Sequence, residues 1–144
     1  MNRTLARPVP THPSRRQPRT LYWLCLLLLC SAYIQGGLVK AFDFPGAVAE
    51  MRHFGLAPAG LLAVATIVGE LAASFMILAG IKRWAGATYL ALFTFFANLV
   101  ANRFWELEGA ARSMSMNSFF EHLGLVGALL FLAWFDLREG RERA

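Results

Sequence analysis

The sequence has few charged residues and few residues that bind metals or form disulfides. Only 16% of its 144 positions are Asp, Glu, Lys or Arg, and the chain holds two cysteines and three histidines. Cys25 and Cys30 are five positions apart, so on a helix they point in different directions and are poorly placed for a disulfide. The sequence contains no C-x-x-C motif and no glycine-rich phosphate loop. These absences argue against a thioredoxin-like enzyme and a P-loop nucleotide-binding protein.

Long apolar runs dominate the chain instead. Hydrophobic residues make up 57% of the positions, and four runs of 17 residues or more stand out: Leu21–Val39, Ala57–Gly80, Trp84–Ala101 and Phe119–Phe135. A helix needs about 20 apolar residues to cross a bilayer. Because lipid cannot hydrogen-bond to the backbone, a spanning segment must be a helix or part of a closed barrel. The sequence therefore predicts an all-α membrane protein, a four-helix transmembrane bundle in one domain over residues 20–136.

The two ends of the chain differ from this domain. Residues 1–19 contain four prolines among arginines and polar residues, which predicts a disordered basic tail. Residues 137–144 form a second charged tail. No clean small-x-small cleavage site precedes Gln35, so we expect the first span to be retained as an uncleaved anchor.

A short amphipathic segment separates spans one and two. Residues 42–46 predict a turn, and apolar residues then recur at helical spacing over 46–54. Glu50 and His53 lie on the opposite side of that helix. We expect a short interfacial helix on the outer membrane surface.

The basic residues are unevenly distributed among the tails and loops. Ten of the 14 lie in the N-terminal tail, the 82–83 turn and the C-terminal tail, and the others are Lys40, Arg52, Arg103 and Arg112. The positive-inside rule then predicts that both termini are cytoplasmic and that the two longer loops are outside. Topology accounts for the net charge of +5, so we predict no nucleic-acid partner.

Glu70 lies in the middle of the second apolar run. A comparable Asp at a helix centre costs about 2.5–3.5 kcal/mol, so we expect Glu70 to be protonated and hydrogen-bonded inside the bundle. At 1.5 Å per residue it lies about 18 Å below the outer start of its span, a depth that Tyr89 shares. Whether this residue is structural or functional stays open at this point. The candidate intramembrane polar site comprises Glu70, Thr66, Tyr89, Tyr33 and Asn98.

A second polar group is predicted near the outer leaflet, where spans one, three and four end or begin. The alternative is that these residues are helix ends that meet lipid headgroups, where charges cost little. The candidate outer-leaflet polar site comprises Lys40, Asn102, Arg103, Glu121 and His122.

Metal and haem sites are not predicted. Glu50-x-x-His53 has the spacing of one half of a di-iron carboxylate motif, but the motif is single and lies in the interfacial segment. His122 could serve as an axial haem ligand, but no second intramembrane histidine accompanies it, since His12 is in the tail. We therefore expect no bound metal.

Seven short segments carry a resemblance to a known family: Gly37-Leu38-Val39-Lys40, Phe54-Gly55-Leu56-Ala57-Pro58, Val68-Gly69-Glu70-Leu71, Leu78-Ala79-Gly80, Lys82-Arg83-Trp84-Ala85-Gly86, Asn102-Arg103-Phe104-Trp105 and Phe119-Phe120-Glu121-His122-Leu123. In this order and spacing they resemble the DoxX family of small four-span bacterial membrane proteins. The resemblance covers roughly residues 20–136. Members commonly have His where this chain has Asn102, and Lys-Asn where it has Glu121-His122.

The resemblance implies an accessory subunit of a quinone-linked oxidoreductase complex in the bacterial plasma (inner) membrane. Such a subunit contacts quinone, holds no redox centre and is not a catalyst by itself. Its partners would be the lipid bilayer and other membrane subunits, or further copies of itself. One alternative is a non-enzymatic membrane scaffold or an assembly protein of chaperone type. A small lipid or solute transporter is disfavoured, because no broken helix pair or inverted repeat is visible.

The charge distribution generates a first test. Single cysteines introduced at Glu50 and Ala110 should react with a membrane-impermeant maleimide added to intact cells, because both positions lie in predicted outer loops. A cysteine introduced at Lys82 should react only after the cells are permeabilised. The opposite labelling pattern would invert the predicted topology.

Overall fold

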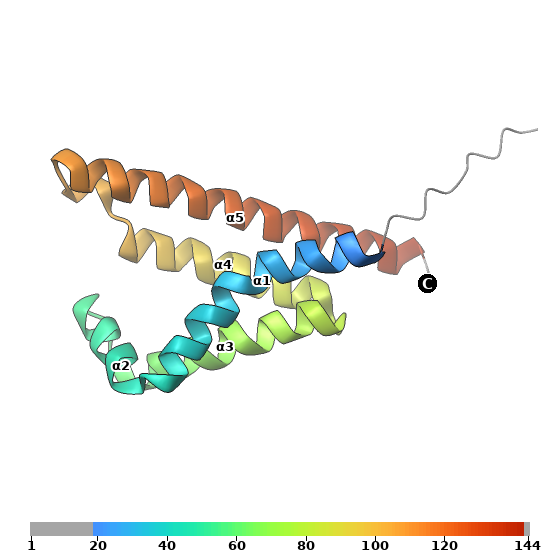
Figure 1. The fold of residues 1–144 in the computed structure, drawn as a ribbon, viewed down its shortest axis with the longest axis horizontal. Helices are drawn as coiled ribbons and strands as arrows, with labels where there is room; N and C mark the ends of the chain where they lie inside the picture. The colour runs from blue at the N-terminus through green and yellow to red at the C-terminus, as the bar shows by residue number, and fades with distance from the viewer. Residues whose placement is uncertain (1–18, 143–144) are drawn as a thin grey trace, which may run out of the picture.

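The computed structural model describes residues 19–142, and it is almost entirely helical (Figure 1). Its elements in chain order are α1 (Arg19–Phe42), α2 (Phe44–His53), α3 (Ala59–Ala79), α4 (Arg83–Ala101), the 3-10 helix η1 (Phe104–Glu106) and α5 (Gly109–Glu142). The predicted disordered tail falls on residues 1–18, which lie outside the described part, and on Arg19, which begins α1. The charged C-terminal segment is helical as far as Glu142.

Within residues 19–142, four helices are long and apolar enough to cross a membrane, so the predicted all-α membrane bundle is confirmed. Their outward faces are apolar, and Leu28, Leu61 and Phe131 are each more than 60% exposed. A water-soluble protein would not present so many large apolar side chains, whereas lipid solvates them.

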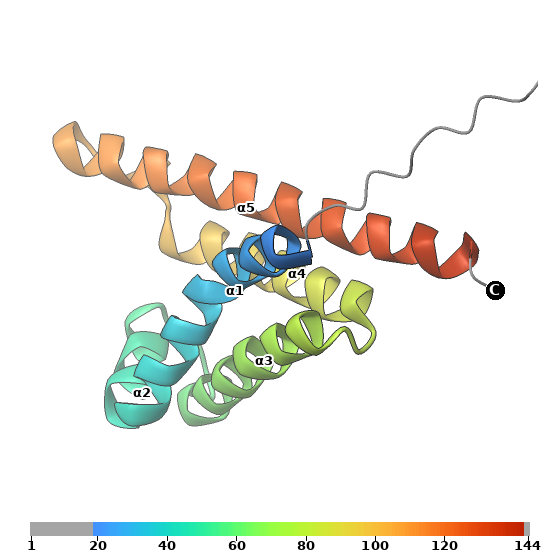
Figure 2. The ribbon, with the colours of Figure 1, turned by 45° about the vertical axis from the view of Figure 1, so that its right-hand side comes forward.

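Each long helix packs mainly on one or two of the others. α5 packs along α4, α4 packs on α3, and α1 packs on α3 (Figures 1 and 2). Figure 1 shows α1 changing direction along its length, so that its second half descends to α2. The main core comes from all four long helices and consists of Leu26, Cys30, Tyr33, Ala73, Ile77, Ala87, Leu90, Ala91, Leu129 and Ala133.

Small residues permit the closest approaches between helices. A Cβ on Gly86 of α4 would lie 2.8 Å from the backbone oxygen of Ala73 in α3. A Cβ on Gly37 of α1 would lie 2.9 Å from the Leu71 side chain. Glycine at these positions lets the helix backbones pack closely, as is common in membrane bundles.

The segment between α1 and α3 is more helical than the sequence indicates. The predicted turn over 42–46 reduces to Asp43, whose Oδ1 accepts a hydrogen bond from the Gly46 backbone N–H at 3.0 Å. α2 buries Ala47 and Met51 against Ala63 of α3, forming a second small core. The predicted short interfacial helix is therefore present, and one face of it packs against the bundle.

The last helix begins earlier than predicted. The expected fourth span starts at residue 119, whereas α5 starts at Gly109. Residues 109–118 are mostly exposed and half of them are polar, so an apolar-run criterion misses them. The rings of Phe104 and Trp105 in η1 pack on Phe119, with centroids 5.3 Å and 6.0 Å away, and brace this part of α5.

Arg83 joins three elements at the end of the bundle where α1 starts and α5 ends. Its Nε donates to the Ile77 carbonyl at 2.9 Å, and its Nη1 lies 3.4 Å from Asp136 Oδ1. Asp136 also accepts from the Trp84 backbone N–H at 3.1 Å. The guanidinium carbon lies 5.5 Å from the Tyr22 ring centroid. This cluster holds the α3–α4 turn against α5 and α1.

Removing the carboxylate from this cluster should destabilise the bundle. We expect Asp136→Ala to lower the free energy of unfolding by about 1–2 kcal/mol, because Arg83 and the Trp84 N–H lose a charged acceptor. Thermal unfolding in detergent, followed by circular dichroism, measures this. Glu106→Ala is the control, since its exposed pair with Arg103 should contribute about 0.5 kcal/mol or less. Equal effects of the two variants would contradict the role given to Asp136.

Candidate functional site

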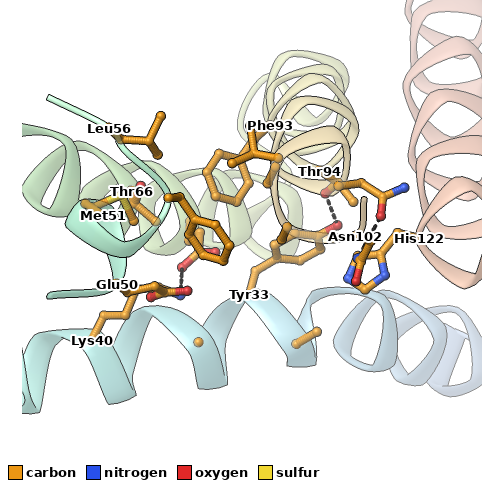
Figure 3. Close-up of a pocket in the computed structure, with 18 of the residues that line it drawn as sticks. Tyr33, Lys40, Glu50, Met51, Leu56, Thr66, Phe93, Thr94, Asn102 and His122 are labelled. Atoms are coloured by element: carbon orange, nitrogen blue, oxygen red, sulfur yellow. Dashed lines mark hydrogen bonds and ion pairs between the residues drawn. The ribbon is translucent and has the colours of Figure 1, made fainter. Parts of the chain in front are cut away.

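A cavity of about 330 Å³ lies between α1, α2, α3, α4 and α5 (Figure 3). It is near the end of the bundle where α1 meets α2 and α4 ends. Apolar side chains such as Met51, Leu56 and Phe93 line part of its wall. Its polar lining consists of Tyr33, Lys40, Glu50, Thr66, Glu70, Thr94, Asn98, Asn102 and His122.

The structure brings most of the predicted site residues together in this one cavity. Members of the intramembrane group and of the outer-leaflet group both line it: Tyr33, Thr66, Glu70 and Asn98 with Lys40, Asn102 and His122. The two groups predicted as separate layers therefore meet, because α1 extends beyond its predicted end and α2 folds back over the bundle.

Three predicted residues lie elsewhere. Arg103 pairs with Glu106 at 3.2 Å on the surface, and Glu121 is exposed. Tyr89 is 43% exposed, and its hydroxyl lies against the backbone at Gly69 rather than toward Glu70.

The cavity also contains two polar residues that the sequence did not single out for it. The sequence predicts Glu50 on the polar face of the interfacial helix, and Thr94 lies within the third apolar run. A weak signal for Thr94 existed, since it lies one helical turn before Asn98 on α4.

Glu70 is paired with a cation rather than with a tyrosine. Lys40 Nζ lies 3.8 Å from Glu70 Oε2, and no hydrogen bond joins Glu70 to Tyr89 or Thr66. The predicted hydrogen bonds to these two residues are thus replaced by an ion pair between α1 and α3. The Glu70 residue is 6% exposed, and its Oε2 has no hydrogen-bond partner among the described residues.

Lys40 reaches Glu70 because α1 is longer than the apolar run. The predicted span ends at Val39, whereas the helix continues to Phe42 and includes Lys40. Side chains on a helix tilt toward its N-terminus, so the long Lys40 side chain extends back into the bundle. A lysine side chain near a helix end is long enough to reach lipid headgroups. Here the side chain of Lys40 instead brings its ammonium group to the buried carboxyl group of Glu70.

The hydroxyl groups of Tyr33 and Thr94 are fixed in direction by one backbone carbonyl. Thr94 Oγ1 donates to the Leu90 carbonyl at 2.7 Å, since a carbonyl can only accept. The Tyr33 hydroxyl must therefore donate to Thr94 Oγ1. Both groups are buried, and this contact joins α1 to α4 beside the cavity.

Two amides and a histidine close the wall formed by α4 and α5. Asn98 Nδ2 donates to the Phe119 carbonyl at 3.0 Å, and Asn98 Oδ1 accepts from Asn102 Nδ2 at 2.8 Å. His122 Nδ1 lies 2.7 Å from the Ser118 carbonyl, so this nitrogen carries a proton. Nε2 of the neutral ring is then an acceptor. Asn98 thus links α4 to α5, whereas His122 is held by a carbonyl of its own helix.

An apolar groove adjoins the cavity between α2, α3 and α4. Its volume is about 490 Å³, and it shares with the cavity Met51, Leu56, Thr66, Phe93, Ala97 and Val100. Its remaining wall comes from Leu62, Ala65, Tyr89, Leu92 and Phe96, several of them on the exposed face of the bundle. A cavity with a cluster of polar groups in its wall thus continues into an apolar groove that reaches the lipid-facing surface.

The residues that form this site lie largely within the part of the chain that matches a known family. The DoxX family model matches residues 24–103, more than half of the chain. The chain belongs to the DoxX family. The matched segment of this DoxX protein includes α1 to α4 almost completely, and with them every polar residue of the cavity except His122.

One curated relative matches this chain over most of both lengths. The inner membrane protein YphA of Escherichia coli (strain K12) is 27% identical over 101 residues, which cover 70% of this chain and 72% of YphA. No solved structure matches the chain. The comparisons and the four apolar helices together make this DoxX protein a multi-pass membrane protein.

The ion pair gives a stability test. Lys40→Met leaves a buried carboxylate without its cation, so we expect the free energy of unfolding to fall by about 3 kcal/mol. In the double variant Lys40→Met/Glu70→Leu both charges are absent, and most of that loss should be recovered. Chemical unfolding in mixed micelles measures both. Additive losses in the double variant would mean that the two side chains do not interact.

Proposed function

We propose that this DoxX protein is an accessory subunit of a quinone-linked membrane oxidoreductase complex, and that its cavity holds the quinone head. The observation that carries this proposal is the continuity between the polar cavity and the apolar groove. A lipid-soluble quinone has the same two parts, a polar ring and an apolar chain. When bound, a quinone supplies reversible two-electron, two-proton chemistry.

The size and lining of the cavity support a ring-sized head. Small-molecule sites commonly measure about 300–1,000 Å³ and combine an apolar wall with a few placed polar groups. This cavity, at about 330 Å³, is at the lower end of that range. Phe93 and Leu125 would contact the ring faces, and Lys40, Glu70 and His122 would face its oxygens.

The groove supports a place for the apolar chain. Tyr89, Leu92 and Phe96 offer an apolar wall on the side of α3 and α4 that meets lipid. A chain lying there would remain in contact with the hydrocarbon while the head is enclosed. Thr66 lies where the cavity and the groove meet, so its size governs whether the two remain joined.

The family resemblance also supports the proposal and assigns a location. DoxX proteins are linked to quinone-reducing or quinol-oxidising membrane assemblies, and YphA is named an inner membrane protein. Both departures from the common family pattern, Asn102 and Glu121-His122, include a residue of the cavity wall. We place this protein in the bacterial plasma membrane with both termini cytoplasmic, which puts the cavity in the outer leaflet.

Purification tests this function directly. Affinity-tagged protein extracted in mild detergent should carry quinone, detected by mass spectrometry of the extracted lipids, together with oxidoreductase subunits. Thr66→Phe should lose most of the quinone, because the larger side chain fills the junction between cavity and groove. Ala72→Phe, on the exposed face of the same helix, should retain it.

Purification of a homo-oligomer that carries neither quinone nor oxidoreductase subunits would contradict the proposal and would favour the scaffold or assembly function instead. Equal quinone content in Thr66→Phe and Ala72→Phe would place the quinone outside the cavity.

A further inference from the structure

Gly36, Lys40 and Glu70 form a small subsite within the cavity. A Cβ built on Gly36 would lie 3.6 Å from both Glu70 Oε2 and Lys40 Nζ. The missing side chain of Gly36 therefore leaves space beside the two charged atoms. All three residues line the cavity, so this space is continuous with the place proposed for the ligand head.

The charged pair leaves hydrogen-bonding capacity that it does not use internally. The Nζ–Oε2 distance of 3.8 Å exceeds that of a hydrogen bond, and Glu70 Oε2 is buried without a partner among the described residues. In the ion pair, where Glu70 is ionised rather than protonated as the sequence predicts, its carboxylate oxygen can only accept and the Lys40 ammonium can only donate. A ligand group that contacts both atoms must therefore accept from Lys40 and donate to Glu70.

A hydroxyl group meets this requirement and a carbonyl does not. A hydroxyl has one proton to donate and lone pairs that accept, whereas a carbonyl oxygen has lone pairs alone. A carbonyl placed here could accept from Lys40, but it would face the lone pairs of Glu70 with no hydrogen between them. A buried charged acceptor left without a donor is costly.

The rest of the cavity wall carries acceptors as well as donors. The proton of the Tyr33 hydroxyl is used by Thr94, while Asn98 and Asn102 each use one of their two Nδ2 hydrogens within the protein. The neutral His122 ring presents Nε2 as an acceptor, because Nδ1 donates to Ser118. The Glu50 carboxylate lines the same space.

From this geometry we infer that Gly36, Lys40 and Glu70 form a hydroxyl-binding subsite that selects a hydroquinone head over the corresponding dione. The inference rests on the proposed function, since it assumes that the cavity holds a quinone-type head. It adds a preference between oxidation states of the ligand. The DoxX protein then retains the reduced form of the carrier and releases the oxidised form.

Binding of three matched probes to the full-length protein in nanodiscs tests the subsite. The probes are a decyl-substituted hydroquinone, its dione and its bis-O-methyl ether, titrated calorimetrically without oxygen. We expect the hydroquinone to bind roughly tenfold or more tightly than the other two, because only it can donate to Glu70. The methyl ether separates hydrogen-bond donation from redox state.

Gly36→Ala provides the matched variant. Its Cβ makes ordinary contacts at 3.6 Å, and alanine favours a helix over glycine, so the protein should unfold at an equal or higher temperature. The added methyl group fills the subsite, and the hydroquinone should lose its advantage over the dione. Gly124→Ala is the control, because a Cβ there meets no atom within 4 Å.

The outcomes separate the two proposals. If the dione binds as tightly as the hydroquinone, or if Gly36→Ala keeps the preference, the subsite is wrong while the quinone site stands. If none of the three probes binds the wild-type protein, both proposals fail. A hydroquinone preference that Gly36→Ala abolishes and Gly124→Ala retains establishes the subsite.

Discussion

The hydrocarbon interior of a membrane cannot hydrogen-bond to a polar group, and this constraint shapes the bundle. The backbone satisfies it by forming helices, and the side chains satisfy it by pairing with one another inside. Tyr33 and Thr94 join α1 to α4, while Lys40 and Glu70 join α1 to α3. α1 packs mainly on α3, so these two polar links determine how its second half is placed beside the cavity.

The cavity follows from the same pairing. α1 bends toward α2 (Figure 1) and its Lys40 pairs with Glu70, and the cavity lies between the second half of α1 and α4. The polar groups that join the helices also line the cavity, so each has a structural partner and a side that faces the cavity. Only Glu70 Oε2, of the cavity's described polar atoms, is buried without a hydrogen-bond partner. Glu70 thus has a structural role through its ion pair with Lys40. Its proposed binding role uses the hydrogen-bonding capacity of Oε2, which that pair leaves free.

The sequence predicted the parts of the protein that depend on composition and on the length and spacing of apolar segments. The four spans follow from apolar runs, and the importance of Glu70 follows from the cost of a carboxyl group in lipid. The partner of Glu70 could not be found this way, because depth along separate helices says nothing about which faces meet. Tyr89 has the predicted depth but faces the groove, whereas Lys40 reaches inward from a helix end that continues past Val39. The start of α5 was missed because residues 109–118 are helical without being apolar.

The length of α5 has a consequence for the shape that the protein presents outside the bilayer. Its 34 residues extend about 51 Å at 1.5 Å per residue, while a hydrocarbon core is about 30 Å thick. Five of the ten residues 109–118 are polar and most are exposed, so the excess length projects beyond the lipid instead of being absorbed by tilt alone. The first turns of α5, braced by η1, thereby form a rigid helical extension that would hold an approaching globular protein away from the membrane surface.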